Sequence, residues 1–247
     1  MDDIGRLGDS SIFKSQRVTQ FSDSVVMSYR VTERSGVFWM INAIALTVIS
    51  LAERGFLLRG AITIGDLYHT PRHVVGPAMV KAYEMESKVA CHPRVIIDPA
   101  VLRLARRRRT EHHTPEEEEE YVRGFIAEDN DGHLFIDYVS WNAVVAVAGA
   151  DDFGYPDYLR TMSGLLRRGL AHEDARVAAK YLWLYPRYLS AIDLFAAIPR
   201  NDPYRLENPE NCEYIENLPR FDDLAAEARD RVARQARKVG RRKRAGQ

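Results

Sequence analysis

The sequence predicts an α+β fold, in which one antiparallel sheet is covered by helices and is followed by a mainly helical extension. Three observations predict it. Short runs rich in Val, Tyr and Phe alternate with helical patterns between residues 16 and 98. Helical periodicity dominates residues 158–198. Of the 247 residues 46% are apolar, which is enough to bury one core together with a helical appendage.

The first element expected is a β-hairpin. Residues 16–21 and 24–31 are both rich in strand-forming side chains, and they flank the polar pair Ser22-Asp23. Such a pattern is typical of a hairpin, so we expect Asp23 at its turn. A carboxylate that projects from a turn can bind a hard cation such as Mg²⁺, although an aspartate at a turn is also common for structural reasons alone.

A helix is expected next, over residues 33–54, because Thr32 is a suitable N-cap and Gly55 follows the apolar run. Residues 37–52 are apolar enough to suggest a membrane span. This stretch has only about 16 residues, whereas a span needs ~20, and Asn42 interrupts it. We therefore interpret it as a buried helix.

Three further elements complete the predicted sheet domain. The apolar run at 56–68 predicts a central strand, the pattern at 75–90 predicts a helix, and RVIID at 94–98 predicts another strand. A ferredoxin-like arrangement would require one more strand and one more helix before residue 12.

The chain changes character after this point. Four arginines at 106–109 and five glutamates at 116–120 predict a solvated excursion, in which Thr114 caps a helix. Two β-like runs, 122–127 and 133–139, then predict a second hairpin.

The remainder of the chain is expected to be helical and then mobile. Residues 158–198 show helical periodicity, with a kink or break expected at Pro186. Residues 201–247 end in a basic stretch, with nine Lys and Arg between Arg229 and Arg244. We interpret this stretch as a solvated, mobile tail, with contact to anionic lipid or nucleic acid as the alternative.

Composition argues against several classes of protein. Lys plus Arg and Asp plus Glu both number 35, so no net charge attracts a polyanion, and we expect neither a stable nucleic acid nor a membrane partner. The two cysteines, Cys91 and Cys212, fit neither a disulfide framework nor a zinc site. The first residues lack the basic and apolar pattern of a signal peptide. We therefore expect a cytoplasmic protein.

Three segments, by their order and spacing, carry a resemblance to a known family. Residues 21–25 (FSDSV) match a hairpin, 59–65 (RGAITIG) a strand, and 76–86 (GPAMVKAYEME) a helix of that family. Together they resemble the class III nucleotide cyclases over residues 13–98, about a third of the chain. The segments FSDS, RGAITIGDLYH and VVGPAMVKAYEMES are most similar to those of the pyrimidine (uridylate) cyclases of bacterial Pycsar anti-phage systems.

The resemblance implies a fold and an activity. The fold is the ferredoxin-like cyclase sheet with covering helices, in a partial catalytic domain (1–100) that is followed by an extension with a hairpin and helices (101–200) and by the tail (201–247). The activity is conversion of a pyrimidine nucleoside triphosphate to its 3′,5′-cyclic monophosphate and pyrophosphate, as an antiviral second messenger. Resemblance alone favours UTP over CTP. The family acts as a homodimer with two Mn²⁺ or Mg²⁺ ions per site, and a separate effector protein reads the product.

The resemblance also implies site residues on the hairpin. Asp23 matches the turn aspartate that binds the metal ions. Arg17 and Thr19 lie on one face of their strand because side chains alternate, and we expect this face, with Phe21, to bind the nucleotide. Arg17 can donate to the carbonyl oxygens of uracil, although an ordinary surface arginine is the alternative.

Two further residues are assigned to the nucleotide. Tyr83 is expected to stack on the base, with a half-buried structural tyrosine as the alternative. Arg94 is expected to meet the triphosphate.

Four positions depart from the adenylate cyclase pattern. Thr19 stands where those enzymes have the lysine that selects adenine, and His73 stands where they have an aspartate. Val80 and Glu84 replace the asparagine and arginine of the transition state. These departures argue against the usual adenylate cyclase chemistry and leave open a different base.

Two metal ions require a second carboxylate, which the family carries on a first strand. Asp2, Asp3 and Asp9 are too close to Asp23, because a strand and its crossover helix need roughly a dozen residues of connection. We therefore expect residues 2–13 to be the end of a missing helix, and an extended chain to be the active form. The alternatives are a catalytically inactive cyclase-like module that binds a nucleotide or a partner, and an unrelated α+β interaction protein.

Overall fold

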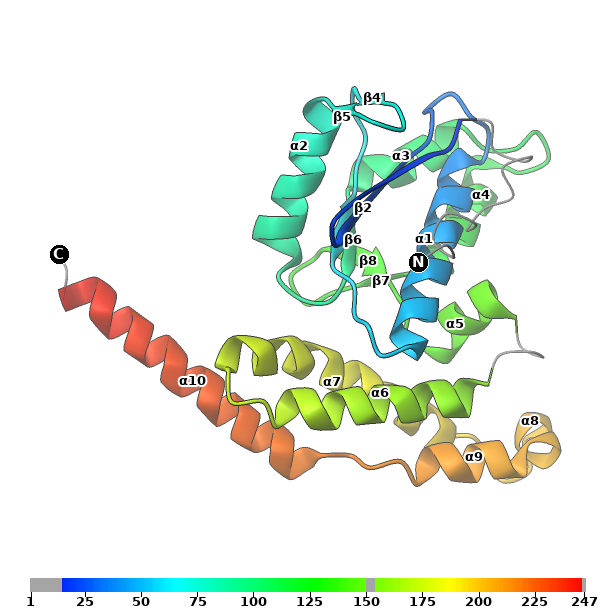
Figure 1. Ribbon diagram of the computed structural model, residues 1–247. Coiled ribbons are helices and arrows are strands. Elements are labelled where there is room, and N and C mark those ends of the chain that lie inside the picture. The colour runs from blue at the N-terminus through cyan, green and yellow to red at the C-terminus, as the bar shows by residue number, and fades with distance from the viewer. Residues whose placement is uncertain (1–14, 150–153, 246–247) are drawn as a thin grey trace. The chain divides into compact units, whose positions relative to one another are not determined.

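The computed structural model describes residues 15–149 and 154–245, and it is mixed α+β, as predicted (Figure 1). It divides into two compact units, which we describe separately. The described residues of the first unit are 15–51, 57–138 and 142–149, and they include every strand of the described chain. The second unit is helical. The expected end of a missing helix, at 2–13, lies outside the described residues.

The first two strands, β1 (Arg17–Phe21) and β2 (Ser24–Ser28), form the predicted antiparallel hairpin. Ser22 has a φ of 52°, a left-handed conformation that the first residue of a tight hairpin turn adopts. Asp23 therefore lies at the tip of the hairpin, where it is exposed.

A four-stranded sheet forms the centre of the first unit. Its order is β3-β6-β8-β7, with β3 parallel to β6 and the other neighbours antiparallel. The strands are β3 (Gly60–Ile62), β6 (Val95–Ile97), β8 (Leu134–Ile136) and β7 (Ile126–Glu128).

This sheet corrects three predictions. It is not wholly antiparallel, because a helical crossover between β3 and β6 returns the chain to the same end of the sheet. The run 56–68 is not one central strand: within it Gly60–Ile62 forms a strand at an edge of the described sheet, and Tyr68 begins a separate two-stranded hairpin. The predicted boundary at residue 100 does not separate the units, because β8 pairs with β6.

Helices surround this sheet in Figure 1, and a two-stranded hairpin of β4 (Tyr68–His69) and β5 (Val74–Val75) leads into the second of them. The helix predicted at 75–90 forms as α2 with a π-helical continuation, η2. The helices of the first unit are α1 (Gly36–Glu53), α2 (Pro77–Glu84), η2 (Met85–Ala90), α3 (Pro99–Arg107), α4 (Pro115–Arg123) and α5 (Trp141–Ala148).

Helix α1 buries one face, with Ile41 and Ala45 fully inaccessible. It starts at Gly36, three residues later than predicted, and Gly55 with a φ of 88° follows its end as expected. Of the described helices, α1 alone is long and apolar enough to cross a membrane, with a mean hydropathy of 1.7 and 39% of that window buried. The core helix of a soluble protein meets the same criterion, so this finding does not locate the chain.

Most residues of the arginine and glutamate runs are exposed, as expected of a solvated excursion, but Arg106 and Glu119 join α3 to α4 and Glu118 is buried. Arg106 of α3 donates to Glu119 of α4 over 2.7 Å. Glu118 is only 1% exposed, and its carboxylate lies 2.8 Å from the His113 ring nitrogen. Helical spacing turns successive glutamates toward different neighbours, which a charge count does not reveal. Thr114 caps α4 as predicted, in a capping box.

We expected a mobile tail at 201–247. In the structure three helices, α8 to α10, form between residues 203 and 245 of this stretch. Burial of Cys212, Ile215, Ala225 and Ala228 supplies the apolar contacts that hold them. Pro186 lies inside α7 (Ala175–Ala196), which continues through it, so of the predicted kink or break the break does not occur. The helices are α6 (Tyr155–Leu170), α7 (Ala175–Ala196), α8 (Pro203–Glu207), α9 (Pro209–Glu216) and α10 (Asp222–Ala245).

Two glycines of α6 provide a matched test of packing in this unit. A methyl group at Gly169 would overlap the ring of Tyr181 on α7, whereas one at Gly164 would meet only the end of the Arg168 side chain at 3.5 Å. We expect Gly164→Ala to raise the free energy of unfolding by up to ~1 kcal/mol, the helix-propensity gain. We expect Gly169→Ala to lower it by ~1–3 kcal/mol, because overpacking outweighs that gain. Urea unfolding monitored by circular dichroism checks both, and a stabilised Gly169→Ala variant would contradict this packing.

Candidate functional site

A groove of about 1080 Å³ opens in the first unit among the β1–β2 hairpin, α1, β3 and α2. It brings together three of the six residues that the sequence assigned to the site: Asp23, Arg17 and Tyr83 all line it. Its apolar wall includes Met40 and Ile44 of α1. A volume of this size is at the upper end of the range of small-molecule sites.

The groove is bordered by the edges of two strands. Consecutive residues of β2 and of β3 line it, without the alternation expected if a face of either strand bordered it. Among the described strands, β2 pairs only with β1, and β3 pairs only with β6. Both strands therefore have backbone N–H and C=O groups on their second edge that no described strand pairs, as is usual for an edge strand.

Four carboxylates line the groove, and two of them have partners. Glu86 forms an ion pair with Arg59, and Glu33 accepts a hydrogen bond from Ser15. Asp23 and Asp66 are exposed. Within residues 15–149 and 154–245 no group of three or more His, Cys, Asp or Glu side chains is placed to hold a metal ion. The described donors therefore do not make up the two-ion site that the resemblance implies.

The hairpin is attached to β4 through one histidine. The Thr19 Oγ1 lies 2.9 Å from Nε2 of His69, and the Ser28 Oγ lies 2.7 Å from Nδ1. Thr19 also donates to the carbonyl oxygen of Thr70 over 3.4 Å. A neutral imidazole satisfies every partner: Ser28 donates to Nδ1, and the Nε2 proton is donated to Thr19. One ring thus fixes both strands of the hairpin.

Burial lowers the pKa of His69 below its ordinary 6.5, and the positive charge of Arg17 lowers it further. The neutral ring is therefore the favoured form in the folded protein. Arg17 and Thr19 share a face of β1, as predicted, because they are two residues apart in a strand. Their surroundings differ: Arg17 is exposed and lines the groove, whereas Thr19 is buried against His69.

The two aromatic candidates are both accessible. Tyr83 of α2 is 63% exposed and lines the groove, so its ring is more accessible than the half-buried tyrosine we considered as an alternative. Phe21 is 42% exposed next to the turn and does not belong to the groove lining.

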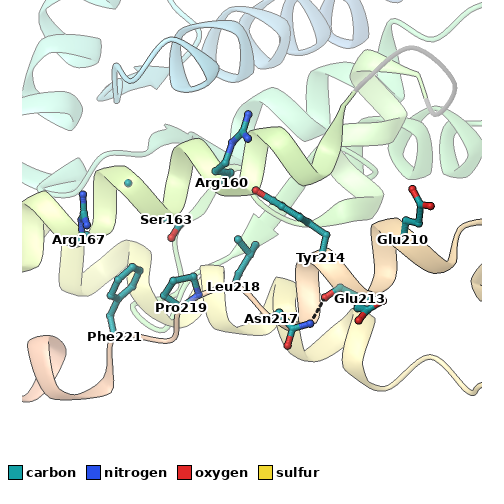
Figure 2. A pocket seen from close by; sticks show the side chains of 11 residues that line it. Arg160, Ser163, Arg167, Glu210, Glu213, Tyr214, Asn217, Leu218, Pro219 and Phe221 are labelled. Atoms are coloured by element: carbon teal, nitrogen blue, oxygen red, sulfur yellow. Dashed lines mark hydrogen bonds between the residues drawn. The ribbon is translucent and has the colours of Figure 1, made fainter.

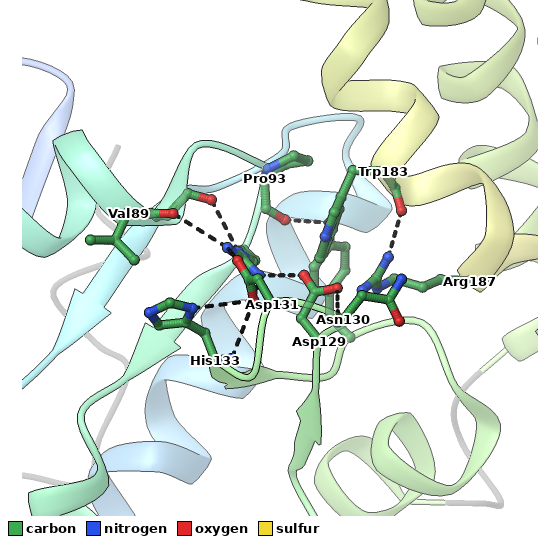
Figure 3. Close-up of polar contacts among 11 residues, drawn as sticks. Val89, Pro93, Asp129, Asn130, Asp131, His133, Trp183 and Arg187 are labelled. Atoms are coloured by element: carbon green, nitrogen blue, oxygen red, sulfur yellow. Dashed lines mark hydrogen bonds and ion pairs between the residues drawn. The ribbon is translucent and has the colours of Figure 1, made fainter. Parts of the chain in front are cut away.

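Arg94 does not belong to this groove. It is 1% exposed, and its guanidinium donates to Asp129, to Asp131 over 2.6 and 3.1 Å, and to the carbonyl oxygens of Val89 and Ala90 (Figure 3). These contacts use all five of its N–H donors. The same bonds hold the pKa of Asp131 well below its usual range. The triphosphate contact expected of Arg94 is therefore corrected to a structural role.

Two polar residues of this region were not identified from the sequence. Asp66 lies in a loop after β3, and His69 belongs to β4. Asp66 could have been identified as a candidate, because it is the one charged residue in the mostly apolar run 60–67. His69 had none, since its partners are 41 and 50 residues away.

A second groove, of about 740 Å³, lies in the helical unit between α6 and the α9–α10 segment (Figure 2). Arg160, Arg167 and Tyr214 line it, and Phe221 closes one end with a strained φ of 58°. Asn217 donates to the carbonyl oxygen of Glu213 within it, over 2.9 Å. It contains none of the residues assigned from the sequence.

Comparison with known proteins found no family model that matches the chain and no significant match among curated proteins or solved structures.

The lowered pKa of His69 makes the attachment of the hairpin dependent on pH. A base with a lowered pKa in the folded state stabilises the fold above the unfolded pKa, near 6.5, and this contribution is lost as the pH falls through the lower, folded pKa. We expect His69→Gln to remove part of the loss of stability between pH 7.5 and pH 5. Urea midpoints of the wild type and the variant across this range check it. The exposed His112→Gln is the control, and an equal effect of both changes would contradict the assignment.

Removal of Arg94 should show what the buried ion pair contributes to stability. We expect Arg94→Met to lower the free energy of unfolding by ~3–5 kcal/mol, because the buried ion pair with Asp129 and the other hydrogen bonds of the guanidinium are lost. The exposed Arg107→Met on α3 is the matched control, with an expected change within ~0.5 kcal/mol. Chemical denaturation measures both. A small effect of Arg94→Met would show that the cluster is solvated.

Proposed function

We propose that this protein is a class III-type nucleotide cyclase that acts on a pyrimidine nucleoside triphosphate, with UTP favoured. The observation that carries the proposal is the position of Asp23: it stands at a tight hairpin tip, exposed, on a groove that Arg17 and Tyr83 also line. This arrangement agrees with the order FSDS, RGAITIG and GPAMVKAYEME in the sequence. The reaction joins the ribose 3′-oxygen to the α-phosphorus and releases pyrophosphate.

Three residues on or beside the groove have distinct roles in this proposal. Arg17 offers N–H donors to the carbonyl oxygens of a pyrimidine base. The accessible ring of Tyr83 offers a surface on which the base stacks. Thr19, held by His69, keeps the strand that carries Arg17 in register with the groove.

Asp23 supplies an oxygen ligand for Mn²⁺ or Mg²⁺, which the reaction requires in this proposal. A second carboxylate must come from outside the described residues. The unpaired edges of β2 and β3 on either side of the groove suit an added strand, which would join the hairpin to the main sheet as the ferredoxin-like arrangement requires. Such a strand would place its side chains beside Asp23.

A homodimer and a separate effector complete the proposal. In the family that the sequence resembles, the nucleotide lies between two copies of the domain. The cyclic product is then read by another protein.

The test compares cyclic nucleotide formation by the 247-residue chain, by an N-terminally extended chain, and by Asp23→Asn in both. Each is incubated with UTP, CTP, ATP or GTP and Mn²⁺, and products are measured by mass spectrometry. We expect the extended chain to convert UTP and Asp23→Asn to lower the rate at least ~100-fold, because a metal ligand is lost. Asp66→Asn, on the same groove, is the matched control and should retain most of the activity.

Thermal stability with UTP and Mn²⁺ separates the alternatives. Stabilisation without turnover in any form would favour an inactive nucleotide-binding module. Absence of both stabilisation and turnover would rule out the nucleotide site. Full activity of Asp23→Asn would rule out Asp23 as a metal ligand.

A further inference from the structure

The zero net charge of the chain conceals an uneven distribution. From Arg231 to Gln247 the sequence contains eight Lys and Arg and no Asp or Glu, so the rest of the chain is acidic overall. This basic stretch is not a loose tail, because α10 continues through it to Ala245. The four cations of this stretch whose side chains the structure describes, Arg231, Arg234, Arg237 and Lys238, therefore lie on one regular helix.

Within the side chains that the structure describes, which in α10 end at Lys238, attachment to the helical unit is confined to the first part of the helix. The hydroxyl of Tyr185 on α7 donates to Asp222 over 2.6 Å, and Ala225 and Ala228 are fully buried. The last attachment is Arg231, which donates to the carbonyl oxygen of Leu170. From residue 233 to 238 every side chain is exposed. The basic part of α10 therefore begins where its packing ends.

Arg234, Arg237 and Lys238 lie on one face of α10, because residues three and four apart are neighbours on a helix. Within the described chain none of the three forms a salt bridge. Like charges at this spacing repel one another, so an anionic partner would relieve an unfavourable interaction already present in the free helix. Charge complementarity therefore indicates a polyanion as the partner of this face.

We propose that the exposed face of α10 that carries Arg234, Arg237 and Lys238 binds the phosphate backbone of duplex DNA without reading its sequence. A helix is about 10–12 Å wide with its side chains, which suits the ~12 Å major groove. A membrane surface fits less well, because interfacial helices bury large apolar side chains and residues 231–247 contain no Leu, Ile, Phe or Trp. This inference is independent of the proposed cyclase activity, and it replaces the expectation, drawn from net charge alone, that no nucleic acid binds.

The test measures fluorescence anisotropy of a labelled 24-base-pair duplex DNA with the full chain, from 50 to 200 mM salt. We expect binding that weakens steeply with salt. The triple variant Arg234→Gln, Arg237→Gln, Lys238→Gln should bind at least ~10-fold more weakly at 50 mM salt. Its log–log salt slope should be shallower by ~2–3, because about 0.9 of a counterion is released per phosphate contact. Glutamine keeps the helix, which circular dichroism verifies.

The matched control removes two arginines and one lysine elsewhere: Arg103→Gln, Arg107→Gln, Lys180→Gln. These side chains are also exposed, and we expect the control to retain wild-type affinity and slope. Equal weakening by both triple variants would overturn the proposal. So would absence of DNA binding at 50 mM salt, or binding to phosphatidylserine vesicles without binding to duplex DNA.

Discussion

The imidazole of His69 is the contact on which the arrangement of the groove depends. It bonds Thr19 of β1 and Ser28 of β2 at once, so it fixes a two-stranded hairpin that no other described strand pairs. An isolated hairpin is marginal in water, and this one gains its position from a side chain of β4. The place of Asp23 and Arg17 on the groove follows from that attachment.

The polar groups of the first unit divide into those that stabilise it and those left accessible. Arg94 and Glu118 are buried and have charged or polar partners, which is the condition under which buried charges are tolerated. Asp23, Arg17 and Tyr83 are accessible on one groove. This division supports Asp23 as a ligand-facing carboxylate, whereas Arg94, also a site candidate in the sequence, has a structural role.

The second unit shows that the net charge of a chain does not reveal how its charged residues are distributed. Overall neutrality suggested an absence of polyanion partners, but α10 collects cations beyond its packed part. Helix formation there is compatible with the sequence, since Ala, Arg, Gln and Lys are all strong helix formers. Whether such a segment is a frayed tail or an ordered cationic helix depends on the buried Ala225 and Ala228, which anchor its start.

Features that depend on neighbouring residues could be predicted from the sequence: the tight turn at Ser22-Asp23, the Thr114 cap, and the mixed α+β class. Contacts between distant residues could not, because they form only when the chain packs. The parallel pairing of β3 with β6, the ion pair of Arg94 with Asp129 and the bridge through His69 each join residues 35 or more positions apart. Local propensity carries no information about such contacts, because burial and hydrogen bonding are fixed by packing.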